Sequence, residues 1–155
     1  SNYAIHHAPC SVLVAKDAPR PVRRILLAVD GSAASEKAVK FLLRHINPAP
    51  DGGEHEPVSV TVAHVMPFLK YPELRQAGKL LVQRYEEKVE KAGFQVEEAM
   101  RLGQPASEIL AQAKRSKTDL IVTGAKGLGA ISRALLGSVS TRVVQHASCS
   151  VLVVR

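Results

Sequence analysis

Short apolar segments alternate with amphipathic ones from residue 24 to residue 155, and this alternation constrains the fold more than any other feature. The segment RILLAVD (24–30) is apolar and ends in an acid, which is typical of a buried strand. The segment 31–46 carries its apolar residues on one stripe at helical spacing, and Ser32 can cap its start. Strands that alternate with helices pair in parallel, with helices on both faces of the sheet. The sequence therefore predicts an α/β protein.

The same alternation continues to the end of the chain. The predicted strands are 24–30, 58–68, 94–103, 118–124 and 149–155, and the predicted helices are 31–46, 72–92, 105–116 and 138–147. In such sheets, ligands bind beyond the carboxyl ends of the strands, where the strand order reverses. Two segments qualify: 29–31 and the connection that follows residue 124.

Composition narrows the class of protein. The chain has 155 residues, 46% of them hydrophobic, which suits one domain with a sizeable core. A net charge of +7 would suit a nucleic acid or a phosphate ligand, but Lys and Arg are scattered and aromatic residues are only 4%, so we do not expect nucleic-acid binding. We see no apolar run of membrane-spanning length and no signal-peptide pattern, and the two cysteines fit a reduced, cytoplasmic setting.

The segment GAKGLGAISRALLGSVS (124–140) is the candidate ligand loop. Gly124, Gly127, Gly137 and Ser138 follow the spacing GxxGx9G[ST]. Glycine permits positive φ and lets a ligand approach without a Cβ in the way. Residue 138 begins a predicted helix, and a helix start offers unpaired N–H groups to phosphate. The side chains that could add hydroxyl groups or positive charge are those of Lys126, Arg133, Ser138 and Ser140.

Two other phosphate-binding loops do not match. A Walker-type loop needs GxxxxGK[ST], and the chain's Gly-Lys pair, Gly78–Lys79, is followed by Leu80. A dinucleotide fingerprint needs GxGxxG after the first strand, whereas GLGAIS (127–132) follows the fourth strand and ends in Ser132.

The spacing that does match, in register with the strands, resembles the nucleotide-binding signature of the universal stress protein family. The resemblance covers about 23–155, through RRILLAVDGSAASEKAV, VTVAHV, DLIVTG and SCSVLVVR. It implies a Rossmann-like (adenine nucleotide alpha hydrolase-like) five-stranded parallel sheet of order 3-2-1-4-5. It also implies ATP, or ADP or AMP, with Mg²⁺, bound across the ends of the first and fourth strands.

Site residues follow from the same resemblance. It implies that Asp30 reaches the ribose region beside Ala28, and that Val65 presents its backbone to the adenine. The other residues would hold the ribose and the phosphates. The nucleotide-binding residues that the resemblance implies are Ala28, Asp30, Val65, Gly124, Lys126, Gly127, Gly137, Ser138, Val139 and Ser140.

Several hypotheses about the function of the protein are compatible with the sequence. The leading hypothesis is an ATP-binding module that senses or regulates in a stress response, with at most slow ATP hydrolysis, because we see no general base. One alternative is a dimerisation module of the same fold whose nucleotide site stays empty, and another is nucleic-acid binding through the basic surface. Simpler interpretations also stand: Asp30 could cap the turn into the helix, and His64 could be a hydrogen-bonded residue rather than a base. We expect no catalytic residue and no metal site, since His6, His7 and Cys10 lack a fourth ligand.

A repeat marks the start of the chain. HAPCSVLV (7–14) recurs as HASCSVLV (146–153), identical at seven of eight positions. We therefore predict that 1–15 is an extra strand that resembles the last strand of a preceding repeat, 16–22 a linker and 23–155 the domain. The resemblance implies pairing through last strands, so residues 11–15 should lie antiparallel to 150–154, in a homodimer or a tandem pair. Cys10 and Cys149 would then lie too far apart for a disulfide.

Overall fold

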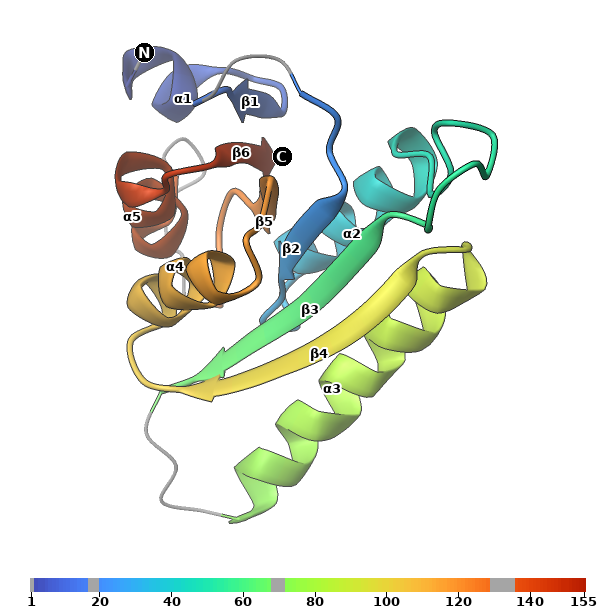
Figure 1. The fold of residues 1–155 in the computed structure, drawn as a ribbon. Helices are drawn as coiled ribbons and strands as arrows, with labels where there is room; N and C mark the ends of the chain where they lie inside the picture. The colour runs from blue at the N-terminus through green and yellow to red at the C-terminus, as the bar shows by residue number, and fades with distance from the viewer. Residues whose placement is uncertain (1, 17–19, 68–71, 129–135) are drawn as a thin grey trace.

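A computed structural model describes residues 2–16, 20–67, 72–128 and 136–155, which form one sheet flanked by helices (Figure 1). The strands are β1 (Val12–Val14), β2 (Arg24–Ala28), β3 (Ser59–Met66), β4 (Gln95–Leu102), β5 (Leu120–Gly124) and β6 (Ser150–Val154). The helices are α1 (Asn2–His7), α2 (Ala33–His45), α3 (Pro72–Lys91), α4 (Pro105–Arg115) and α5 (Ser138–His146).

The α/β class and the Rossmann-like arrangement are confirmed. The described strands lie in the order β1-β6-β5-β2-β3-β4, and all neighbours are parallel except β1 and β6. The sheet has six strands rather than five because the N-terminal segment, predicted as an extra strand, joins the sheet as an antiparallel edge strand. The strands β4, β3, β2, β5 and β6 keep the neighbours that the order 3-2-1-4-5 assigns.

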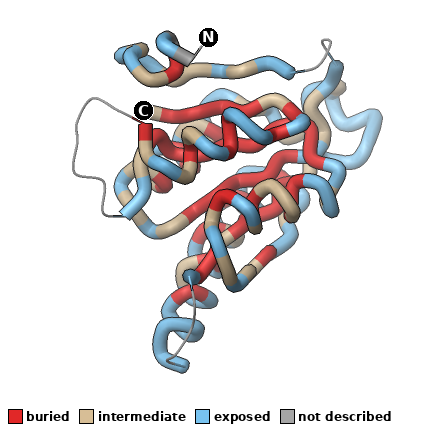
Figure 2. The backbone as a smooth tube through the Cα atoms, turned by 90° about the vertical axis from the view of Figure 1, so that its left-hand side faces the viewer, coloured by how far each residue is buried: buried red, intermediate tan, exposed pale blue. Residues whose placement is uncertain are grey.

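Alternation along the strands builds two cores, one on each face of the sheet. In β2, Ile25 and Leu27 pack with buried residues of α2 and α3, whereas Leu26 and Ala28 pack with residues of α4, α5 and α1. Both faces are therefore apolar, as expected of strands covered by helices on each side. Figure 2 shows the buried backbone concentrated along the sheet, with exposed positions on the outer surfaces.

The N-terminal segment corrects one prediction. Residues 1–15 were expected to supply only a strand, but 2–7 form helix α1 and only 12–14 form strand β1. The repeat explains this difference, because His7 corresponds to His146 and each of them ends a helix that precedes a strand. Strand β1 does lie antiparallel to β6, and both cysteines are free, as predicted.

The topology places the ends of β2 and β5 together. Strand β2 lies between β3 and β5, so the chain leaves β2 toward one side of the sheet and returns to the other side at β5. The loops after β2 and β5 therefore diverge at the carboxyl edge, which is where open parallel sheets bind ligands. None of the helices within the described residues is long and apolar enough to cross a membrane.

Candidate functional site

A cavity of about 560 Å³ lies at the carboxyl ends of β2, β3 and β5. This volume falls within the range of small-molecule sites. All ten residues predicted from the sequence line it: Ala28, Asp30, Val65, Gly124, Lys126, Gly127, Gly137, Ser138, Val139 and Ser140. The structure therefore brings together residues from four separate segments of the chain.

An apolar wall completes this cavity, and the sequence interpretation missed it. The additional apolar residues include Ala63, Pro67, Pro105, Ile109 and Leu136. Pro105 and Ile109 come from the first turns of α4, which begins where β4 ends. Ile109 packs in the same core cluster as Ala28, so the start of α4 lines the cavity on the face of the sheet that carries Ala28. The rule that ligands sit at strand ends could have pointed to this turn, but no motif marks it.

Asp30 links the start of α2 to the loop after β5. Its Oδ1 accepts hydrogen bonds from the Ser32 N–H at 2.9 Å and from the Ser35 hydroxyl at 2.7 Å. Its Oδ2 accepts from the Leu128 N–H at 2.9 Å. The simpler interpretation of Asp30, a cap for the turn into the helix, is therefore confirmed. Oδ1 already accepts two hydrogen bonds, whereas Oδ2 accepts one and has a second lone pair that can accept a ligand hydroxyl.

These contacts also settle the charge of Asp30. Burial would raise the pKa of this carboxyl, but hydrogen bonds from Ser32, Ser35 and the Leu128 amide stabilise the ionised form and lower the pKa below its ordinary value. Asp30 is therefore a carboxylate at neutral pH, well suited to accept hydrogen bonds and poorly suited to remove a proton.

The signature needs glycine at positions 124 and 127 for different structural reasons. We expected positive φ to be one reason for glycine, but Gly124, Gly127 and Gly137 are not among the described glycines with positive φ. A Cβ at Gly124 would lie 2.7 Å from the backbone and Cβ of Ala34, so this glycine lets α2 pack against β5. A Cβ at Gly127 would lie 2.6 Å from Asp30 Oδ2. Gly124 is therefore needed for the packing of α2 against β5, whereas Gly127 leaves room for the Asp30 carboxylate beside the loop.

The start of α5 presents unpaired amides to the cavity. Gly137 is the N-cap, and no side chain caps the helix start within the described part of the chain. The Thr141 N–H is the first to bond within the helix, to the Gly137 carbonyl at 3.0 Å, so the amides of residues 138–140 precede the first helical bond. A helix start of this kind attracts anions.

Ser140 has a different role from the one its hydroxyl suggested. It is 3% exposed, and its Oγ donates to the Ala125 carbonyl at 2.9 Å or the Gly137 carbonyl at 3.0 Å. The hydroxyl therefore fixes the loop to the helix start and leaves only its amide for a ligand. Ser138 is exposed and its hydroxyl remains accessible. Among the described residues that line the cavity, Lys126 has the one Lys or Arg side chain. Arg133, the other predicted cation, lies outside the part of the chain that the structure describes.

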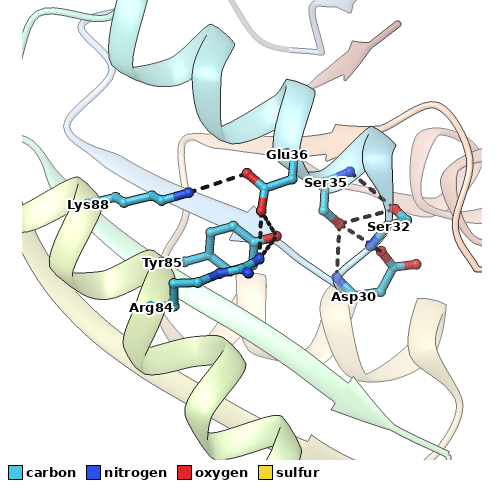
Figure 3. A network of polar contacts seen from close by, with 7 residues as sticks. All are labelled: Asp30, Ser32, Ser35, Glu36, Arg84, Tyr85 and Lys88. Atoms are coloured by element: carbon cyan, nitrogen blue, oxygen red, sulfur yellow. Dashed lines mark hydrogen bonds and ion pairs between the residues drawn. The ribbon is translucent and has the colours of Figure 1, made fainter.

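Two further groups hold the walls in place. The Nδ1 of His64 donates to the Val29 carbonyl at 2.8 Å, which confirms that this histidine is hydrogen-bonded. On α2, Glu36 accepts hydrogen bonds from Arg84 at 2.6 Å and from the Tyr85 hydroxyl at 2.9 Å (Figure 3). Burial would raise the pKa of Glu36, but the bond from Tyr85 and the nearby Lys88 and Arg84 charges lower it. This cluster ties α2 to α3 beside the residues that orient Asp30.

Fold and site together define the class: a Rossmann-like α/β protein with a ligand-sized cavity at the point where strand order reverses. The model of the Universal stress protein family matches residues 21–155. Universal stress protein MJ0531 of Methanocaldococcus jannaschii is 34% identical over 143 residues, which cover 86% of this chain and 82% of that protein. The chain therefore belongs to the universal stress protein family.

Solved structures agree on the fold. Hypothetical protein MJ0577 matches with a TM-score of 0.74 at 27% identity, over 86% of this chain and 95% of that one. A universal stress protein in complex with cAMP matches with a TM-score of 0.67 at 21% identity, over 86% and 97%. A family member from Arabidopsis thaliana with AMP bound matches with a TM-score of 0.63 at 24% identity, over 86% and 91%.

Proposed function

We propose that this chain binds an adenine nucleotide, ATP or else ADP or AMP, in the cavity, and that it acts as a nucleotide-dependent regulator in a stress response. One observation carries the proposal: the cavity has a cationic, amide-rich end at Lys126 and the start of α5, and an apolar end at Ala63 and Ile109. A nucleotide has the matching pair of ends, a flat apolar base and an anionic phosphate chain. The neighbours bound to AMP and cAMP support an adenine nucleotide.

We propose the following roles for the predicted residues. Asp30 accepts from the ribose hydroxyls, and the backbone of Val65 meets the adenine beside Ala28. The phosphates lie against the amides of Ser138, Val139 and Ser140, with Gly127 and Gly137 allowing close approach. Gly124 acts indirectly, by letting α2 approach β5. Mg²⁺ would be held chiefly by phosphate oxygens and water, because the described residues contain no group of three or more potential metal ligands.

Hydrolysis of ATP would be slow at most. The carboxylate in the cavity, Asp30, has a lowered pKa and is engaged by three donors, so it is a weak base. Ser138 is exposed and begins a helix, and His64 donates its Nδ1 hydrogen to the Val29 carbonyl. The chemistry of the site therefore suits binding and release, as a regulator in the cytoplasm requires.

A second candidate function is a pairing module of the same fold whose nucleotide site stays empty. The observation that favours it is the β1–β6 ladder, in which residues 12–14 pair with 151–153. We also propose that residues 1–15 derive from the last helix and strand of a preceding repeat, joined by a linker at 16–22 to the domain at 23–155. In that case the chain corresponds to the second unit of a tandem protein.

Titration calorimetry with adenosine and with Mg-ATP tests the nucleotide proposal. Lys126→Ala should weaken ATP binding by roughly tenfold, because one charge-assisted contact is lost, and should leave adenosine binding unchanged. Lys79→Ala is the matched control, since Lys79 lies on the exposed face of α3, away from the cavity. Equal losses for adenosine and ATP would place the phosphates elsewhere, and binding of neither ligand would favour the pairing module.

A further inference from the structure

Ser35, in the first turn of α2, lines the cavity, but its hydroxyl is already engaged by the protein. The residue is 4% exposed, and its Oγ donates to Asp30 Oδ1 at 2.7 Å. The same Oγ accepts from the Asp30 N–H at 2.9 Å. One serine therefore holds both the side chain and the backbone of one aspartate, as Figure 3 shows.

This contact divides the Asp30 carboxylate into a closed oxygen and an open one. Oδ1 accepts from the Ser35 hydroxyl and from the Ser32 N–H at 2.9 Å, which occupies both of its lone pairs. Among the described residues, the one donor to Oδ2 is the Leu128 N–H at 2.9 Å, which leaves Oδ2 a second lone pair. Because Asp30 lines the cavity, that lone pair can accept one hydrogen bond from a ligand.

Ser35 cannot follow Asp30 if the carboxylate turns, because neighbours on both sides hold the first turn of α2. Ala34 lies against β5, where a Cβ at Gly124 would approach it to 2.7 Å. Glu36 accepts from the hydroxyl of Tyr85 on α3 at 2.9 Å. A turn of Asp30 would therefore separate it from Ser35 and leave a buried hydroxyl without its acceptor, which is costly. The serine thus favours the orientation of Asp30 in which Oδ1 stays closed.

We propose that Ser35 is a positioning residue that keeps Asp30 oriented with Oδ2 alone open to the ligand, and that the site consequently recognises one of the two ribose hydroxyls. This inference rests on the proposed function, because a nucleotide supplies the ribose, and it narrows the role of Asp30 to a single hydroxyl. A carboxylate that accepts from both hydroxyls, one to each oxygen, needs a free lone pair on both oxygens, and Ser35 occupies the last one on Oδ1. The other hydroxyl can therefore be absent without loss of this contact.

Titration calorimetry of the full chain with Mg-ATP and with its 2′-deoxy and 3′-deoxy analogues tests the inference. The parent should bind one analogue at least about tenfold more weakly than ATP, because that analogue lacks the hydroxyl that donates to a charged acceptor. It should bind the other within about threefold of ATP. The Kd of the weaker analogue divided by the Kd of ATP is the discrimination ratio.

Ser35→Ala should lower this ratio rather than weaken every ligand equally. Without the serine hydroxyl, Asp30 can turn and Oδ1 gains a free lone pair, so the bond to the ligand hydroxyl is no longer favoured in one orientation. ATP should bind roughly tenfold more weakly, whereas the discriminated analogue should bind as it does to the parent. A residue that only stabilises the fold would change all three affinities together and leave the ratio as it is.

The chain offers a matched control and a conservative replacement. Ser107 lies in the first turn of α4 as Ser35 does in α2, but it is exposed and does not line the cavity, so Ser107→Ala should keep the parent's ratio. Ser35→Thr keeps a hydroxyl at the same position and should also retain discrimination. If Ser35→Ala does not fold, Ser35→Cys repeats the test, because a thiol fills the site but is a weak donor.

Several results would overturn the inference alone. Losses of tenfold or more with both deoxy analogues would mean that Asp30 accepts from both hydroxyls, so that Oδ1 is not closed. Equal binding of all three ligands by the parent would mean that Asp30 accepts from neither. A folded Ser35→Ala or Ser35→Cys variant with the parent's ratio would show that the serine does not orient Asp30. Failure of the parent to bind any of the ligands would instead refute the proposed function, and this inference with it.

Discussion

Gly124 and Gly127 belong to one signature, but the structure gives them separable roles, and replacing each by alanine should reveal the difference. A Cβ at Gly124 would lie 2.7 Å from the carbonyl carbon, the oxygen and the Cβ of Ala34, whereas ordinary contacts begin at 3.4 Å. The first turn of α2 would therefore have to move by about 0.7 Å. Since α2 is anchored by the fully buried Val39 and Leu42, it cannot move freely.

The expected magnitudes follow from these contacts. Overpacking of this kind costs about 1–3 kcal/mol, so Gly124→Ala should lower Tm by roughly 3–10 °C in a domain of this size. A Cβ at Gly127 would meet only Asp30 Oδ2, the end of a side chain that can turn aside. Gly127→Ala should cost about 1 kcal/mol or less, the net value of the lost Leu128 hydrogen bond, but should weaken ATP binding.

Thermal and urea unfolding followed by circular dichroism, with ATP titration of the folded variants, separates the two roles. If Gly127→Ala lost more stability than Gly124→Ala, or if Gly124→Ala unfolded at the parent temperature, the assignment of Gly124 to packing would be refuted.

Three other predictions follow from particular contacts. Because the pKa of Asp30 is lowered by folding, its ionised carboxylate stabilises the protein above the unfolded pKa of about 3.9, and this stabilisation is lost as pH falls through the folded value. Asp30→Asn should therefore make the free energy of unfolding less dependent on pH in the acid range, and an unchanged dependence would contradict this. Tyr85→Phe removes the hydroxyl that donates to Glu36 and should lower the free energy of unfolding by about 1.5 kcal/mol, measured by urea denaturation; a neutral effect would mean that the bond is not formed in solution. Duplex DNA at physiological salt should not displace bound ATP, and nucleotide-independent DNA binding that weakens steeply with salt would instead support a nucleic-acid function.

The fold was largely predictable because the strands carry continuous apolar runs. Segments such as RILLA are buried on both faces, and strand–helix alternation leaves few topologies. The N-terminal helix was missed because NYAIHH is too short to show a helical stripe, and Ile5 is the one buried residue among the side chains of that helix whose burial is described. Tertiary packing on α5, rather than local propensity, accounts for that helix.

The site was predictable where it follows the strand ends and the glycine spacing, because parallel strands bring their carboxyl ends to one edge. Contacts made through the fold were not predictable. Nothing in the sequence places Pro105 in the cavity wall, directs the Leu128 amide to Asp30, or turns the Ser140 hydroxyl toward the Ala125 carbonyl. Each depends on how a helix or loop packs on a distant segment.

Calorimetric titration with Mg-ATP of the parent, Ser138→Asp and Ser138→Ala tests the central claim most directly. Aspartate in the first turn of α5 favours the helix, so Ser138→Asp should fold at least as stably as the parent. Its carboxylate would lie beside the phosphates, so ATP should bind the parent and Ser138→Ala but not Ser138→Asp. If ATP bound Ser138→Asp as tightly as the parent, the phosphates would not lie at the start of α5, and the account of the site would be contradicted.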